Sequence, residues 1–205
     1  MLALAYPVRK VPRHTGFTMV ELMVTLAVMA VLAALALPSF QVFMAENRAS
    51  GKTVELVAAV KTAQSEALRR SRQVLFTFTD SPMPSTALTG AVNGKSWATV
   101  VLPLADASSS VTPEVVNVGG YSEGTADVVV SASTTAMCFM PDGSIKANTT
   151  TGVTGADCAV NASSGAQFLI QPSLGTKRWQ VSVSPTGKVT SCLGTVGGSG
   201  VFTCS

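Results

Sequence analysis

Glu21 is the residue whose type and surroundings point most directly to chemistry. It is the only charged residue from Phe17 to Leu37, and residues 22–45 carry no charge at all. A carboxylate in an apolar membrane segment is costly unless a cation pairs with it. Cleavage between Gly16 and Phe17 would supply one, because the new α-amino group would lie four residues before Glu21, on the same face if that end is helical. The amino terminus of a neighbouring subunit and a tolerated position among lipid headgroups are the alternatives.

The four cysteines are the second set of reactive side chains, and all lie in the C-terminal third of the chain. They are Cys138, Cys158, Cys192 and Cys204. No two form a C-x-x-C pair, which favours disulfides in an oxidising compartment. We expect sequential pairing, Cys138 with Cys158 and Cys192 with Cys204, among three connectivities. A four-thiolate zinc site and free buried thiols are the alternatives.

Enzymatic chemistry finds little support in the residue types. The only histidine is His14, which lies before Gly16, so a chain cleaved there would have no imidazole for nucleophilic catalysis or metal binding. The Gly197–Gly200 stretch lacks the strand and helix context of a phosphate loop, and Asp142-Gly143-Ser144 lacks the acidic positions of a calcium loop. We expect no enzyme activity, no metal and no cofactor.

The apolar segment after Gly16 is long enough to cross a bilayer, which takes about 20 residues. The basic residues that precede it favour a cytoplasmic N-terminus. A secretory signal is the usual alternative, but no small-residue cleavage site follows the apolar run, so we expect the helix to be retained. Without residues 1–16 the chain has 11 basic and 11 acidic residues, which gives no basic surface for nucleic acid.

The sequence Gly16-Phe17-Thr18-Met19-Val20-Glu21-Leu22 resembles the processing site of type IV prepilins and pseudopilins. The resemblance implies that prepilin peptidase removes residues 1–16 and methylates the new N-terminal Phe17, and that Glu21 directs filament assembly. Pro38 stands where this family often has a helix-kinking proline. Because proline removes a backbone hydrogen bond, we expect a kink or a local melt near Leu37.

The helical pattern continues to about Arg72 and becomes amphipathic after Pro38. Its expected apolar stripe includes Val54, Ala63 and Leu68. We divide the chain into a leader (1–16), a transmembrane and filament-core helix (17–45), an amphipathic half (46–72) and a periplasmic β domain (73–205). The arginines at positions 69, 70 and 72 close the helix, either as a solvated end favoured by the helix dipole or as a phosphate or partner site.

Beyond residue 73, β-branched and aromatic runs alternate with turn residues. The predicted strands are Val74–Thr79, Trp97–Leu102, Asp127–Ala132, Ala136–Met140, Gln167–Gln171, Arg178–Ser184 and Lys188–Cys192. Turn chemistry at Met140–Ser144 and Ser184–Lys188 predicts hairpin connections. Polar stretches at 81–89, 105–112 and 148–164 are expected loops. These elements predict an α+β, pilin-like fold, with one long N-terminal helix packed on antiparallel sheet.

Three segments resemble the GspH/FimT family of minor pilins and minor pseudopilins. They are Ala63–Arg70 with the strand after it, Phe139–Ser144 and Val183–Val189. The resemblance implies a minor pilin in the priming or tip complex of a type IV pilus. The implied partners are other pilins or pseudopilins, prepilin peptidase and the inner membrane. The implied location is a single-pass inner-membrane protein with a periplasmic domain, extracellular once assembled.

Two other functions remain open. A minor pseudopilin of type II secretion would be anchored and assembled through the same kind of N-terminal helix. The expected disulfides favour a pilus subunit over a pseudopilin only slightly. DNA uptake is associated in some relatives with a Gly-Arg-x-Arg motif, which here reads Gly187-Lys188-Val189-Thr190 and lacks both arginines. Lys177, Arg178 and Lys188 would have to form the DNA or partner patch, with Trp179 as a stacking platform or simply as a packed core residue.

Overall fold

The computed structural model describes residues 16–81, 88–103, 113–120, 128–159 and 165–196, and the backbone of 202–204. The predicted leader before Gly16, the whole predicted loop 105–112 and parts of the predicted loops 81–89 and 148–164 lie outside these ranges. The chain divides into two compact units between Phe40 and Gln41.

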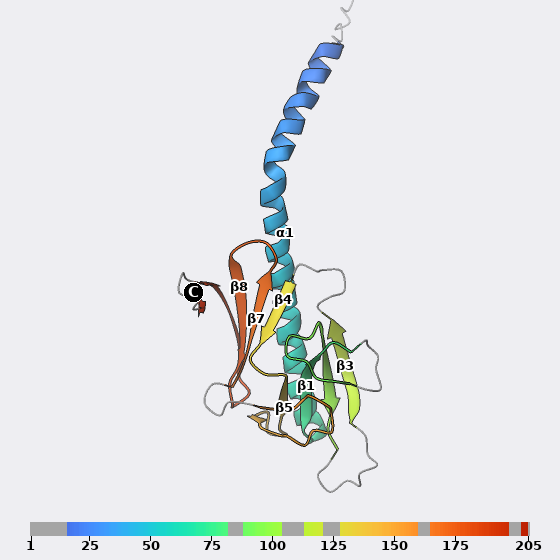
Figure 1. Cartoon of the computed structure of the whole chain (residues 1–205), viewed down its shortest axis with the longest axis vertical. Coiled ribbons are helices and arrows are strands. Elements are labelled where there is room, and N and C mark those ends of the chain that lie inside the picture. The colour runs from blue at the N-terminus through green and yellow to red at the C-terminus, as the bar shows by residue number, and fades with distance from the viewer. Residues whose placement is uncertain are drawn as a thin grey trace, which may run out of the picture. The chain divides into compact units, whose positions relative to one another are not determined.

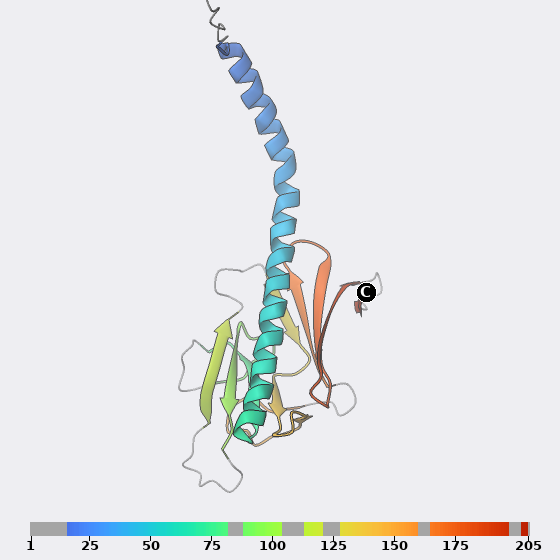
Figure 2. The same cartoon turned by 180° about the vertical axis from the view of Figure 1, so that it is seen from behind.

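A single helix, α1 (Met19–Arg70), runs through both units (Figures 1 and 2). It is two residues shorter at each end than predicted. It ends where Ser71 takes a left-handed conformation, with φ 50°. There the Ser71 N–H donates to the Leu68 carbonyl and the Arg72 N–H donates to the Ala67 carbonyl, at 3.4 and 3.3 Å. This pair of bonds is the Schellman arrangement, which satisfies carbonyls that the helix end leaves open.

The described strands form two antiparallel sheets beside the second half of α1. They are β1 (Val74–Thr79), β2 (Ser96–Val101), β3 (Glu114–Gly120), β4 (Val128–Ala132), β5 (Ala136–Phe139), β6 (Ile145–Lys146), β7 (Ala166–Pro172), β8 (Lys177–Val183), β9 (Val189–Val196) and β10 (Phe202–Cys204). The first sheet has the order β3-β2-β1-β5-β6 and the second β10-β9-β8-β7-β4. The predicted antiparallel β domain packed on one long helix is confirmed.

All seven predicted strands are present, with ends that differ by at most a few residues. Val74–Thr79 has the predicted bounds, and the two predicted hairpin turns join β5 to β6 and β8 to β9. Three strands were missed: β3, β6 and β10. β3 lies at a sheet edge, has no buried residue and ends in two glycines, so its sequence lacks the alternation that marks a half-buried strand.

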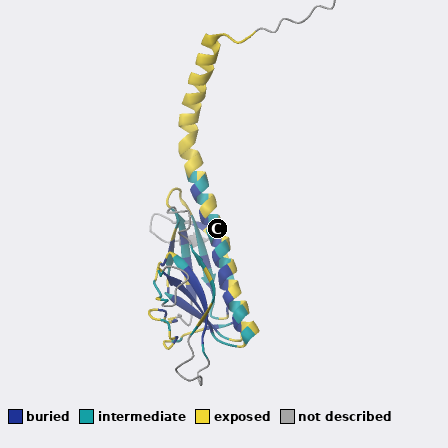
Figure 3. Cartoon of the chain, turned by 90° about the vertical axis from the view of Figure 1, so that its right-hand side faces the viewer, coloured by how far each residue is buried: buried dark blue, intermediate teal, exposed yellow. Residues whose placement is uncertain are grey.

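Small side chains on α1 form the contact with both sheets. Its buried residues are Ala45, Ala49, Thr53, Leu56, Ala59, Val60, Ala63 and Ala67. They recur every three or four positions, so they share one face, which Figure 3 shows as the dark stripe on the lower helix. Six of them, all except Ala45 and Thr53, form one core cluster with residues of β1, β2, β4, β5, β6, β7 and β8. The prediction that Val54 and Leu68 belong to this stripe is wrong, since they are 67% and 51% exposed.

The first sheet is covered on its other face as well. Leu75, Ala98, Val100 and Cys138 pack there against Cys158 and neighbouring loop residues. This second cluster explains why every residue of β1 is buried, because successive side chains enter opposite clusters.

The predicted disulfide between Cys138 and Cys158 is confirmed. It joins β5 to the loop that covers the second cluster, with a Cα–Cα distance of 5.7 Å. The backbones of Asn148 and Cys158 also bond to each other in both directions. Cys192 is disulfide-bonded too. Its predicted pairing with Cys204 stays a prediction, because the Cys204 side chain lies outside the described residues.

The double variant Cys138→Ala, Cys158→Ala is expected to lower the free energy of unfolding by about 3 kcal/mol. This is the chain-entropy value for opening a loop of this length. Urea unfolding of the full chain in detergent, followed by tryptophan fluorescence, measures the loss. An unchanged midpoint would show that the covering loop is held by its other contacts.

Candidate functional site

The predicted processing site lies in extended chain just before α1. Residues 16–18 are exposed and not helical. Phe17 is 82% exposed, and no atom lies within 4 Å of the position that a Gly16 Cβ would take. The peptide bond between Gly16 and Phe17 is therefore open to another protein without unfolding of the helix.

Thr18 caps α1 and fixes the position of Glu21 in its first turn. The Thr18 hydroxyl accepts a hydrogen bond from the Glu21 N–H at 3.2 Å, and its carbonyl accepts one from the Leu22 N–H at 3.1 Å. Thr18 and Glu21 have the Thr-x-x-Glu spacing of a capping box. This spacing is readable in the sequence, although the cap is not among the sequence-based predictions. An acid in the first turn also suits the positive end of the helix dipole.

The helix starts after Phe17 in the uncleaved chain, so the two ends of the predicted ion pair do not share a helical face here. Glu21 itself is exposed, and no cation contacts it among the described residues. Pairing with the new α-amino group of Phe17, in the same subunit or in a neighbour, stays a prediction.

The first unit offers a continuous apolar surface. Every residue from Met19 to Phe40 is exposed, as the yellow upper helix in Figure 3 shows. α1 is long enough and apolar enough to cross a membrane, and no part of its apolar window is buried within the chain. Pro38 lies inside the helix without interrupting it, so the local melt is not found and the kink stays a prediction.

Gln64 joins the three segments that carry the family resemblance. Its side-chain amide donates to the carbonyls of Gly143 and Gly187, at 2.8 and 3.0 Å, and so bonds the tips of both hairpin turns to α1. The two hairpins also bond to each other, since the N–H of Ile145, the first residue of β6, donates to the Pro185 carbonyl at 3.0 Å. These contacts link residues 79 and 123 positions apart in the sequence. The shared motif is therefore a structural junction.

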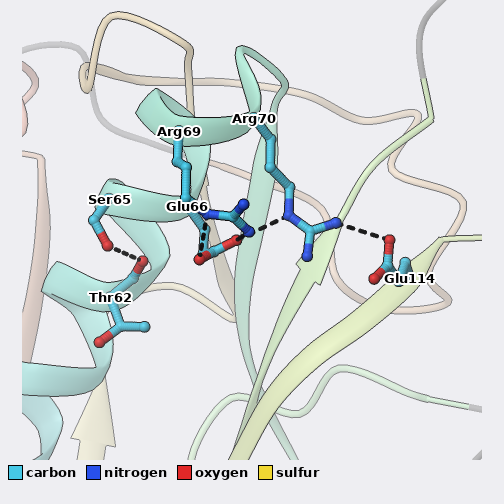
Figure 4. A network of polar contacts seen from close by, with 6 residues as sticks. All are labelled: Thr62, Ser65, Glu66, Arg69, Arg70 and Glu114. Atoms are coloured by element: carbon cyan, nitrogen blue, oxygen red, sulfur yellow. Dashed lines mark hydrogen bonds and ion pairs between the residues drawn. The ribbon is translucent and has the colours of Figure 1, made fainter.

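The arginines at the helix end are tied to carboxylates (Figure 4). Arg69 donates two hydrogen bonds to Glu66, at 3.0 and 2.6 Å. Arg70 donates to Glu66 at 2.8 Å and to Glu114 on β3 at 2.9 Å. Two of the three arginines are thus paired within the chain, which weakens the case for a phosphate site. The network attaches the first edge strand to α1.

Hydrogen bonds from Arg69 and Arg70 lower the pKa of Glu66 from 4.5 to about 2. Because the folded pKa lies below the unfolded one, the network contributes fully above pH 4.5 and is lost as the pH falls toward 2. We expect Glu66→Gln to be less stable than the parent chain at pH 7, with the difference vanishing near pH 2. Urea midpoints at pH 7, 4.5 and 2.5 measure this. A pH-independent difference would mean that Glu66 acts through packing.

Lys177, Arg178 and Lys188 do not form one patch, which corrects the predicted DNA or partner site. Lys177 and Arg178 begin β8, whereas Lys188 follows the turn at its other end. The strand separates them by about 20 Å at 3.3 Å per residue. Lys177 is also paired with Glu46 at 3.0 Å. Trp179 packs against the main core cluster, which is the simpler of its two interpretations.

The described residues contain no candidate metal site. Within the described ranges, no three side chains of the types His, Cys, Asp and Glu lie close enough together to hold an ion.

Two family models match the chain. The model "Type II transport protein GspH" matches residues 53–187, which is more than half of the sequence. The model "Prokaryotic N-terminal methylation motif" matches residues 12–37 and includes Gly16, Phe17 and Glu21. Their boundaries divide the chain into the segment that carries the processing site and the segment that carries the Gln64 junction.

Individual relatives align only with a short part of the chain. A fimbrial protein of Pseudomonas aeruginosa is 35% identical over 60 residues, which cover 29% of this chain and 38% of the relative. The type IV major pilin protein PilA of Myxococcus xanthus is 43% identical over 53 residues, 26% of this chain and 24% of PilA. The crystal structure of the Pseudomonas aeruginosa type IV minor pilin FimU superposes with a TM-score of 0.45 at 14% identity, covering 72% of this chain and 90% of FimU. The chain thus spans well under half the length of these sequence relatives.

Proposed function

Because this chain belongs to the family of type II transport protein GspH, we propose that it is a minor pilin, anchored in the inner membrane and assembled through its N-terminal helix into a type IV pilus. Its place would be the priming or tip complex. The main support is the match to the N-terminal methylation motif, which covers the processing site and the start of an apolar helix that has no covering partner in its own unit. Such a surface needs lipid before assembly and other helices after it.

The proposed location follows the same physics. The helix is a single membrane span, the globular unit lies in the periplasm, and the assembled subunit is extracellular. Disulfides in the globular unit suit an oxidising compartment. The role is structural, without an enzymatic reaction.

The maturation step has prepilin peptidase cutting between Gly16 and Phe17. We expect Gly16→Ala to slow processing by about tenfold, because a methyl group beside the scissile bond alters the fit in the peptidase while nothing in the chain itself contacts it. The matched control is Gly51→Ala, since Gly51 also has open space around it but lies on α1. Gel mobility and mass spectrometry of the mature N-terminus measure the outcome. Equal processing of both variants would contradict the assigned cleavage site.

A minor pseudopilin of a type II secretion system is the second candidate. The family to which the chain belongs, that of type II transport protein GspH, favours it. Both candidate functions use the same N-terminal helix, so the structure of that helix does not distinguish them. They differ in whether pilus formation or protein secretion fails when the protein is absent.

Deletion of the gene in the native host tests the two candidates together. Surface pili counted by electron microscopy fall if the chain is a minor pilin, whereas secreted proteins disappear from the medium if it is a pseudopilin. Complementation with the intact gene must restore the lost phenotype. A deletion that leaves pili and secretion unchanged would reject both assignments.

A further inference from the structure

The β7–β8 turn, residues 173–176, is held against α1 at Glu46. Lys177 forms an ion pair with Glu46 at 3.0 Å, and Glu46 is largely buried. Gly175 has φ +103°, and a Cβ there would lie 2.8 Å from Glu46 Oε1. The turn therefore packs on this part of the helix with no space between them. In Figure 1 it is the orange loop that joins β7 to β8 beside α1.

Glu46 is the first charged residue after the apolar segment. Under the proposed function the mature chain begins at Phe17, so 29 residues precede Glu46. The 27 of them that are helical, from Met19 on, extend about 40 Å at a rise of about 1.5 Å per residue. A bilayer with its headgroups is about 40–45 Å thick. Glu46, and the turn attached to it, are thus at the depth of the outer headgroup layer, and any tilt of the helix moves them deeper.

The composition of the turn suits that position. All four residues are exposed, and Leu174 is 47% exposed in spite of its apolar side chain. Two cations, Lys177 and Arg178, begin β8 directly after the turn, against the single carboxylate of Glu46. An apolar side chain flanked by basic residues is the pattern that binds the boundary between acyl chains and anionic headgroups.

We propose that the β7–β8 turn is a second membrane contact of this protein. Leu174 enters the headgroup region, and the basic residues beside it lie over anionic lipid phosphates. This contact holds the globular unit on the bilayer until the subunit leaves for the filament. The inference rests on the proposed membrane anchor and adds a lipid-binding site outside the anchoring helix.

Tryptophan substitution in the full chain tests the contact. Leu174→Trp places a reporter in the turn, and Thr186→Trp places a matched reporter at an exposed position of the turn at the other end of β8. Gln64 contacts that second turn, 18 residues along α1 from Glu46, or about 27 Å. Both variants are reconstituted in phosphatidylglycerol vesicles with and without lipid brominated near the headgroup. The signal of the parent chain, from Trp97 and Trp179, is subtracted.

The added fluorescence of Leu174→Trp is expected to be quenched at least about twofold, and that of Thr186→Trp to be almost unchanged. Adding Arg178→Gln to Leu174→Trp should weaken the quenching. Equal quenching at the two sites, or none at Leu174, overturns the proposal, and the latter result would leave the turn free for a protein partner. Vesicle flotation separates this failure from failure of the anchor, because an anchored chain floats whether or not the turn touches lipid.

Discussion

Glu21→Ala is expected to leave the globular unit folded and to lower the amount of this protein in purified filaments by about tenfold, which corresponds to about 1.4 kcal/mol of lost assembly energy. The wild-type carboxylate lies in the first turn of α1, and residues 22–45 after it carry no charge, so an amine is the partner that reduces its cost there. Alanine removes that attraction without adding bulk. Quantitative immunoblots of sheared filaments against total membrane protein measure the ratio.

Two controls make the Glu21 experiment specific. Glu55→Ala removes another acid from α1, one whose described ion pair is with neighbouring Lys52 at 2.8 Å, and should not affect assembly. Mass spectrometry of the N-terminus verifies that Glu21→Ala is still cleaved, so that poor maturation is not mistaken for poor assembly. Wild-type levels of processed Glu21→Ala in the filament would refute the ion-pair argument.

Gly187→Ala is expected to destabilise the globular unit by about 3–5 kcal/mol, from left-handed strain and overpacking together. Gly187 has φ +83°, and an added Cβ would collide with the Gly143 carbonyl oxygen and lie 2.5 Å from the Gln64 amide nitrogen. Neither backbone can move away, because Gln64 bonds both turns to α1. Urea unfolding of the full chain in detergent measures the loss.

Gly152→Ala is the matched control for Gly187→Ala. Gly152 has a similar φ of +72°, but a Cβ there would meet only the Pro113 ring at an ordinary 3.5 Å. Its substitution should therefore cost only the backbone strain, about 1–2 kcal/mol. If the two variants lose equal stability, the close approach at the Gln64 junction contributes nothing.

The sequence by itself determined the features whose signals are local. The apolar run and Glu21 predicted the exposed helix, and β-branched and aromatic residues predicted Val74–Thr79 with its observed bounds. Gly143 and Gly187 have positive φ angles at the two predicted hairpin turns. These features depend on neighbours a few positions away, where hydropathy period and turn chemistry act.

Only the tertiary structure decided how these pieces meet. Edge strand β3 is paired with β2, and its Glu114 binds Arg70 on α1. These partners are far from β3 in the sequence, so the residues of β3 alone do not predict the strand. The same holds for the Gln64 junction, the separation of Lys188 from Lys177, and the attachment of the β7–β8 turn to Glu46. Long-range hydrogen bonds and ion pairs join groups that each have many candidate partners along the chain, and packing alone selects among them.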